Sequence, residues 1–547
     1  MAAKTVVFGL DGACFGLIEP WLDADALPTL AGLIEAGDSS ALESCVPATT
    51  PPAWTSLTTG VNPGKHGVFG FYQRTPGSYD LPPVTDRSVS ARRLWDYTST
   101  TGLTSLVVNV PVTHPARETE GALVPGYLAP DQPVTHPRSI LAELGIEDYR
   151  VYAPSEADDV PDEQLLSEWL ALTDSRQDAA LALMDAYNWD LLFVEFQKTD
   201  GAVHKFDERQ KVRKIYERVD KCMGTILDAI ETDPNVFVVS DHGIGQRKEW
   251  AIALNTWLSQ QGYVATRNGQ EYESSWIEQV TNDRIYDEQA GDSTYPSRIL
   301  DVLGRTGLTK QRLERLLSTL GFYELAVRFA PKGIGRNLAQ EVVDRPASTA
   351  FYEGMGFSGV DVGVVINDER FYPEGRVEKS DYEAFRRELV DSLSELTGPD
   401  SKHPFSQVRT REEVYDGRRV NEAPDIILKQ SSNYVIGSQH PRGKAFIPAD
   451  RIDHTREGLL AAAGPDIEDE WSNERIPHIT DVTPTLLHLL DISLNDRFDG
   501  RPLDMLSVDH EPRIETYEPF EKDEATDLSN NEEDALEERL KSMGYLE

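Results

Sequence analysis

Apolar residues recur along this chain in two spacings that alternate from one segment to the next. Short apolar runs of strand length occur at 5–10, 103–110, 191–196 and 236–240. Segments with a helical spacing of apolar residues include 26–36, 174–187 and about 206–232. Fully apolar strands that alternate with helices are typical of a parallel sheet covered by helices. We therefore expect an α/β fold in which helices sandwich a mostly parallel central sheet.

The second half of the chain shows a less regular pattern. Further strands are expected at 363–366, 425–428 and 458–463. Between 250 and 350, charged residues, aromatics and short helical patterns mix, which indicates a cap or lid inserted into the fold. We divide the chain into a first core part at 1–249, the insert at 250–350, a second core part at 351–505 and an acidic tail at 506–547. The tail ends in a predicted short amphipathic helix.

Composition narrows the class of protein. None of the apolar runs approaches 18 residues, so no spanning helix is expected. The first eleven residues lack the long apolar stretch of a signal peptide, which predicts a cytoplasmic protein. The three cysteines, Cys14, Cys45 and Cys222, show no C-x-x-C spacing. This argues against a disulfide framework and against a cysteine zinc site.

The charge is strongly acidic, with a formal net value of −40 spread along the whole chain. A protein that follows the backbone of duplex nucleic acid needs the opposite sign, so we expect no such partner. An even acidic excess is typical of surfaces kept soluble in concentrated salt, and it predicts a halophilic source. An ordinary acidic protein with an acidic tail is the alternative.

Several polar residues follow directly on predicted strands. Asp11 comes after the first strand, and Asp241-His242 end the strand at 236–240. Asp200 and His204 follow the strand at 191–196, and their spacing places both on one face if the segment is helical. The carboxyl edge of a parallel sheet is where open α/β folds bind ligands. Each of these residues taken alone is more often structural.

Thr50 lies just before Pro51-Pro52, and prolines suit the first turn of a helix. A hydroxyl at a helix N-terminus feels the positive end of the helix dipole, which favours an alkoxide and an incoming phosphate. The alternative is a threonine that only caps the helix.

A late histidine, His454, completes a possible ligand set. Together with Asp11, Asp200, Asp241, His204 and His242 it gives three carboxylates and three imidazoles, a mixture that suits two zinc-like ions. Two divalent ions carry four positive charges, which three carboxylates and a Thr50 alkoxide would balance.

These motifs together resemble the alkaline phosphatase superfamily, in its type I phosphodiesterase/nucleotide pyrophosphatase branch. The nucleophile segment of that branch resembles P-x-x-T-x-P followed by T-G and P-x-x-H-G, matched here by Thr50, Thr59-Gly60, Pro63 and His66-Gly67. Stretches at 108–113, 255–258 and 423–425 also look like the bacterial and archaeal members of this branch, and 479–487 followed by 499–503 resembles a C-terminal signature of the superfamily. The resemblance spans most of 1–505 and thins in the insert.

The resemblance implies Thr50 as the nucleophile and two divalent metal ions as cofactors, with zinc expected and manganese or iron as alternatives. One ion would be held by Asp200, His204 and His454. The other would be held by Asp11, Asp241, His242 and the Thr50 oxygen. The implied reaction is hydrolysis of small-molecule phosphate esters through a covalent phospho-threonine.

Two departures from the branch bear on the substrate. Ala53 and Phe71 stand where nucleotide pyrophosphatases usually carry asparagines, which puts a nucleotide substrate in doubt. The sulfatase motif C-x-P-x-R is absent from the nucleophile position. Because no cation for a dianionic monoester is evident, a phosphodiester or pyrophosphate bond is favoured over a phosphomonoester or a phosphonate. A phosphosugar mutase and a non-catalytic protein that keeps the fold are more distant alternatives, and the oligomeric state stays open.

Overall fold

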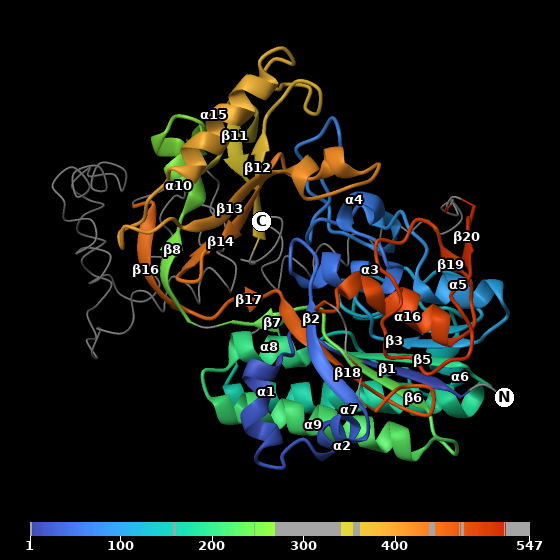
Figure 1. Cartoon of the computed structure of the whole chain (residues 1–547). Helices are drawn as coiled ribbons and strands as arrows, with labels where there is room; N and C mark the ends of the chain where they lie inside the picture. The colour runs from blue at the N-terminus through green and yellow to red at the C-terminus, as the bar shows by residue number, and fades with distance from the viewer. Residues whose placement is uncertain are drawn as a thin grey trace, which may run out of the picture.

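The computed structural model describes residues 3–156, 160–245, 247–268, 341–353, 361–436, 444–469, 471, 475–518 and 520. Its main sheet has seven strands in the order β2-β18-β6-β1-β5-β3-β4 (Figure 1). The strands are β1 (Thr5–Leu10), β2 (Asp38–Glu43), β3 (Ser105–Val108), β4 (Gly121–Val124), β5 (Leu191–Phe196), β6 (Asn235–Val239) and β18 (Glu457–Ala463). Strands β6, β1, β5, β3 and β4 pair in parallel, and β18 is antiparallel to both its neighbours, so β2 runs in the same direction as those five. The predicted α/β class and mostly parallel sheet are confirmed.

Helices cover both faces of this sheet. They are α1 (Phe15–Leu22), α2 (Pro28–Ala36), α3 (Thr50–Thr59), α5 (Leu94–Thr100), α7 (Asp162–Ala186), α8 (Lys198–Lys205), α9 (Arg209–Asp228) and α16 (Val482–Leu489). Alternate residues of β1 enter different cores: Val6 and Phe8 pack with α7 and α9, whereas Val7 packs with α3, α5 and α16. Figure 1 shows α7 and α9 below the sheet and α3 and α16 above it. The central strand is therefore buried on both faces, as its fully apolar sequence predicts.

A smaller part with its own apolar core stands beside the main sheet (Figure 1). It contains the antiparallel sheet β11-β12-β14-β13 and the three-stranded sheet β15-β8-β16. Its elements are β8 (Lys248–Ile252), α10 (Leu254–Gln260), β11 (Ala350–Tyr352), β12 (Asp361–Ile366), α15 (Tyr382–Ser394), β13 (Phe405–Thr410), β14 (Ile426–Gln430), β15 (Tyr434–Ile436) and β16 (Phe446–Arg451). Among the described residues the other α-helices and strands are short: α4 (Pro63–His66), α6 (Ile140–Glu143), β7 (Gly243–Ile244), β9 (Thr266–Asn268), β10 (Glu341–Val343), β17 (His454–Thr455), β19 (Leu494–Asn495) and β20 (Ile514–Glu515).

The predicted second core part, 351–505, contributes strands to both the main sheet and the smaller part. The strands expected at 363–366 and 425–428 form, but as β12 and β14 they pair antiparallel in the smaller part. The strand expected at 458–463 is β18 of the main sheet. Most of the predicted insert, 269–340, and the predicted tail helix lie outside the described residues. In the part of the chain that the structure describes, no helix is long and apolar enough to cross a membrane.

Candidate active site

The three predicted carboxylate ligands lie just after three neighbouring strands of the main sheet. Asp11 follows β1, Asp241 follows β6, and Asp200 lies in α8 directly after β5. Because β1 pairs with both β5 and β6, the three segments leave the sheet side by side. This edge is the carboxyl end of the parallel strands, where the sequence predicted the site.

The imidazoles join this group from three places: His204 from α8, His242 from the turn after β6, and His454 from the second half of the chain. His204 lies one helical turn after Asp200, with its Nε2 3.2 Å from Asp200 Oδ1. Strand β17 pairs with β7, and the rings of His454 and His242 stack with centroids 4.0 Å apart. His454 Nε2 lies 2.8 Å from His204 Nε2. The structure thus brings all six predicted ligands together.

The chemistry of this donor set fits divalent metal ions. Asp11, Asp241 and His242 are fully buried. The atoms without a hydrogen-bond partner among the described residues include Asp11 Oδ1, Asp200 Oδ1, Asp241 Oδ2 and His242 Nε2. Buried acceptors without donors are costly unless a cation satisfies them. Carboxylate oxygens and imidazole nitrogens are also among the donors that bind zinc and other divalent ions.

Two overlapping sets of three have donor atoms within 4.8 Å of one another: Asp200, His242 and His454, and Asp11, Asp241 and His242. The second set contains three of the four ligands that the family resemblance implies, the fourth being the Thr50 oxygen. In the first set His242 takes the place expected for His204, although His204 contacts both Asp200 and His454. His242 therefore lies at the junction of the two groups.

Burial and mutual repulsion set the protonation of these groups. Burial, together with the charge of Asp200, raises the pKa of Asp11 and of Asp241 well above the ordinary carboxyl value. Burial also opposes ionisation of Asp200, but the nearby histidines outweigh it and lower its pKa. Burial lowers the pKa of His242 to about 4 and that of His454 to about 3, so both imidazoles are neutral at pH 7. Neutral imidazole is the form that binds a metal.

Thr50 is the first residue of α3, as the proline pair after it predicted, and its side chain is buried. Pro51 and Pro52 occupy the first turn, where a missing backbone N–H costs nothing. All ten residues of α3 are buried, so packing on every side fixes the helix. A rigid helix holds its N-terminal hydroxyl in one place, which a nucleophile requires.

Trp54 connects this helix to the carboxylates. It lies four residues after Thr50, on the same helix face, and its Nε1 donates a hydrogen bond of 3.2 Å to Asp11 Oδ2. The close approach depends on Gly9 in β1, since a Cβ there would lie 2.5 Å from the Trp54 ring. The bond to Oδ2 leaves Asp11 Oδ1 available to a metal ion.

The smaller part of the protein holds the segment that carries His454. Asp453 Oδ1 accepts the His454 N–H at 2.9 Å, and Asp453 Oδ2 accepts from Gln430 of β14 at 3.0 Å. Two residues beyond His454, Arg456 forms a two-point ion pair with Asp361 of β12, at 2.5 and 3.0 Å. The Gln430–Asp453 hydrogen bond and the Arg456–Asp361 ion pair therefore join the small antiparallel sheet to residues that flank a predicted metal ligand.

Ala53 and Phe71, which replace the asparagines usual in nucleotide pyrophosphatases, lie in the core. Ala53 is fully buried, and Phe71 packs edge-on against Tyr127. His66 is buried, its Nδ1 accepts the Val68 N–H, and its Nε2 lies 2.9 Å from Ser56 Oγ of α3. Burial lowers the pKa of His66 well below its usual value, so this histidine is neutral and holds α3 in place.

Sequence reasoning missed the contacts of Trp54, Gln430 and Asp361. The four-residue spacing from Thr50 could have placed Trp54 on the nucleophile's side of the helix. Nothing local marks Gln430 or Asp361, because their partners lie 23 and 95 residues away along the chain.

Comparison with known proteins identifies the family of this chain. The family model for type I phosphodiesterase/nucleotide pyrophosphatase matches residues 5–305, more than half of the chain. The chain belongs to this family, and it is a phosphoric ester hydrolase. A comparison with curated protein sequences found no significant match.

Solved structures share the alkaline phosphatase-like fold. Phosphonoacetate hydrolase from Sinorhizobium meliloti 1021, in complex with phosphonoacetate, aligns with a TM-score of 0.52 and 15% identity over 90% of this chain and 96% of that one. Its complex with phosphonoformate gives 0.50 and 16% over the same shares. Murine ectonucleotide pyrophosphatase/phosphodiesterase 5 gives 0.47 and 13% over 92% of this chain and all of that one.

Proposed function

We propose that this enzyme hydrolyses phosphodiester or pyrophosphate bonds in small-molecule phosphate esters, with Thr50 as the nucleophile. The observation that carries the proposal is the buried cluster of carboxylates and imidazoles with unpartnered donor atoms, joined through Trp54 to the helix that begins at Thr50. Two divalent ions, zinc first and manganese or iron as alternatives, would be held by Asp11, Asp200, Asp241, His204, His242, His454 and the Thr50 oxygen.

Bound metal ions would supply Lewis-acid chemistry, which lowers the pKa of a coordinated hydroxyl and neutralises charge on a phosphoryl group. The protein's own contribution is position. Thr50 Oγ1 loses its proton to solvent and attacks phosphorus in line, so that a phosphorus–oxygen bond to the threonine forms. The bond to the leaving alcohol or phosphate oxygen breaks, and a leaving alkoxide takes up a proton from water. Water then hydrolyses the phospho-threonine and restores the hydroxyl. The helix N-terminus favours the negative charge that gathers there.

The proposal is tested by hydrolysis of bis(p-nitrophenyl) phosphate beside p-nitrophenyl phosphate, with zinc or manganese restored after chelation and in concentrated salt. We expect metal-dependent activity that favours the diester. A preference for the monoester would instead support the phosphomonoesterase alternative.

The role of Thr50 is tested separately. We expect Thr50→Ala to abolish turnover while metal binding is kept, and Thr50→Ser to keep part of the activity because a hydroxyl remains. Substantial turnover by the alanine variant would remove Thr50 from the nucleophile's role. A phosphorylated Thr50 trapped by rapid acid quench would support it directly.

A further inference from the structure

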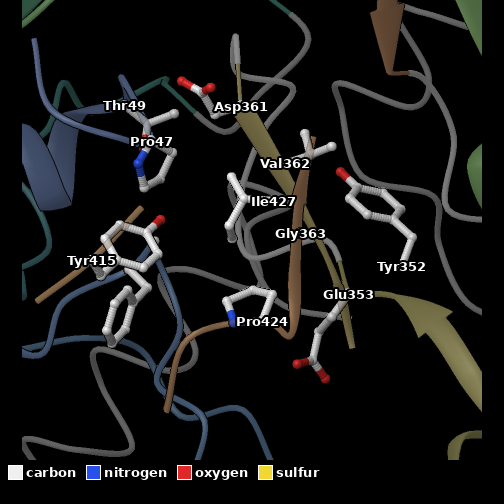
Figure 2. Close-up of a pocket in the computed structure, with 12 residues that line it drawn as sticks. Pro47, Thr49, Tyr352, Glu353, Asp361, Val362, Gly363, Tyr415, Pro424 and Ile427 are labelled. Carbon is white, nitrogen blue, oxygen red and sulfur yellow. The ribbon is translucent and has the colours of Figure 1, made fainter. Parts of the chain in front are cut away.

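A cleft lies beside the start of α3, between the core and the small antiparallel sheet. The cleft is narrow and partly open to solvent. Pro47 and Thr49, from the segment that leads into Thr50, line one side, and Val362 and Ile427 of β12 and β14 line the other (Figure 2). Thr49 directly precedes the proposed nucleophile, so the cleft borders the segment that carries Thr50.

Most of the cleft wall is apolar. Pro47, Phe69, Val362, Tyr415, Pro424 and Ile427 contribute carbon surface. The rings of Phe69 and Tyr415 pack edge to face with centroids 5.2 Å apart, which fixes one wall. Apolar clefts with a few polar groups are typical of sites for organic ligands.

The charged groups that line the cleft are two carboxylates, Glu353 and Asp361, and no lysine, arginine or histidine is found among its described lining residues. Figure 2 shows Asp361 beside Thr49 at one end and Glu353 beside Pro424 at the other. Asp361 is neutralised by Arg456. Glu353 is paired with Arg74 and Arg345, at 3.3 and 3.5 Å.

The arginines behind these carboxylates are already engaged. Arg74 donates to the Tyr372 hydroxyl and to the backbone oxygens of Glu422 and Ala423. Arg456 donates hydrogen bonds from both Nε and Nη2 to Asp361. An anion that entered the cleft would lose water and would meet carboxylates rather than free cationic donors, which is unfavourable.

Thr49 Oγ1 is a buried oxygen of the cleft that has no hydrogen-bond partner among the described residues, and Glu353 Oε2 has its ion pair with Arg74 but no hydrogen bond. Both belong to side chains at most 5% exposed. A ligand that carries hydroxyl or N–H groups on an apolar body would satisfy them. An anionic ligand could accept a hydrogen bond from the Thr49 hydroxyl, but it would bring a further acceptor to the Glu353 carboxylate.

Resting on the proposed function, we propose that this cleft binds one organic ester group of the substrate and selects an uncharged, largely apolar or aromatic group over an anionic one. The preferred substrate is then a phosphodiester of uncharged alcohols, rather than a pyrophosphate whose second phosphate would enter the cleft.

The test compares two diesters with the same leaving group, p-nitrophenyl phenyl phosphate and p-nitrophenyl 4-carboxyphenyl phosphate. They differ by one carboxylate on the retained ring. For the metal-loaded enzyme we expect kcat/KM to be at least about tenfold higher for the phenyl ester, as a charge in a partly desolvated site implies. Equal values, or a preference for the carboxyphenyl ester, would overturn the proposal.

The variant Glu353→Gln tests whether the cleft causes the discrimination. It removes a negative charge and adds an amide donor without changing shape, so the ratio between the two esters should shrink several-fold. The control is Asp368→Asn, which removes a buried, arginine-paired carboxylate of the same small part outside the cleft lining. An equal change in both variants would show that the cleft does not select.

Failure of the cleft proposal is distinguishable from failure of the proposed function by a binding measurement without turnover. In metal-loaded Thr50→Ala, calorimetry would compare phenylphosphonate with 4-carboxyphenylphosphonate. Tighter binding of phenylphosphonate, without hydrolysis of any ester by the unmodified enzyme, would support the cleft and refute the proposed reaction. Equal affinities beside normal diester hydrolysis would refute the cleft alone.

Discussion

The indole nitrogen of Trp54 lies 3.2 Å from Oδ2 of Asp11, so one hydrogen bond joins the helix that begins at Thr50 to the carboxylate that follows β1. Both side chains are fully buried. Groups that hold a metal ligand in this way orient its free oxygen, and their loss typically lowers metal affinity by about 10- to 100-fold.

We expect Trp54→Phe to weaken binding of one metal ion by at least about tenfold. The bond from Trp54 also lowers the pKa of Asp11, so its loss makes the carboxyl harder to ionise. Titration of the metal-free protein with zinc would measure the change. Trp95→Phe is the matched control, because Trp95 is equally buried and packs on the same Phe193 ring. An equal loss of affinity in both variants would assign the effect to packing.

The contact between Gln430 and Asp453 gives a second prediction. Gln430→Leu keeps the side-chain size but removes the amide that holds Asp453, which in turn accepts the His454 N–H. We expect the number of tightly bound metal ions to fall from two to one, since only one predicted ligand group contains His454. Gln407→Leu, at an exposed position of the neighbouring strand β13, serves as the control. Retention of both ions by Gln430→Leu would contradict a role for the small sheet in the metal site.

Metal binding should release protons. Burial raises the pKa of Asp11 and Asp241 in the metal-free protein, so these carboxyls keep protons to a higher pH than free ones. A metal ion displaces them, and its affinity should rise with pH by about tenfold per unit for each proton displaced. Calorimetry in buffers with different ionisation enthalpies counts the protons. Asp241→Asn should release fewer, and no proton release by the unmodified protein between pH 5.5 and 8 would refute this expectation.

The buried Glu195 predicts a pH-dependent cost in stability. Burial, followed by the charge of Asp241, raises its pKa well above the ordinary value, and its Oε1 has no hydrogen-bond partner among the described residues. A raised carboxyl pKa in the folded state means that stability is lost as pH rises from about 4.3 through the folded value. We expect Glu195→Gln to raise the free energy of unfolding of the metal-free protein, and to do so more at pH 8 than at pH 5.5.

Urea unfolding at several pH values measures this difference. The control is Glu168→Gln, because hydrogen bonds from Gln164 and Ser155 lower the pKa of Glu168 against the opposing effect of burial. That carboxyl is ionised in both folded and unfolded states above pH 5.5, so its substitution should give a constant change. A pH-independent effect of Glu195→Gln would show that Glu195 is not protonated in the folded state.

Local sequence predicted the strands of the main sheet well where they are buried on both faces. The strand at 191–196 was predicted with its observed bounds, because a fully apolar run between polar segments has few alternatives. Strands β2 and β4 were not predicted. Strand β2 contains Asp38, Ser39, Ser40 and Glu43, and lies at the edge of the sheet, where polar residues are tolerated.

The strands at 363–366 and 425–428 show where local pattern is insufficient. Their apolar sequences predicted strands correctly, yet the same composition suits the centre of a parallel sheet and the inner strands of a small antiparallel one. Which sheet they join depends on pairing with β11 and β13, and these partners are chosen by contacts distant in sequence.

The sequence by itself determined the fold class and the candidate ligands, because strand ends and D-x3-H spacing are local patterns, and the order of these motifs along the chain points to the family. Tertiary structure alone decided how the ligands are grouped, with His242 between two sets, and how Trp54, Gln430 and Asp361 support them. It also decided that the cleft beside Thr49 is formed by β12 and β14 rather than by Ala53 and Phe71. The physical reason is that hydrogen bonds, ion pairs and cavities depend on the distance between atoms in space, and residues far apart in sequence reach that distance only when the sheets and helices have packed.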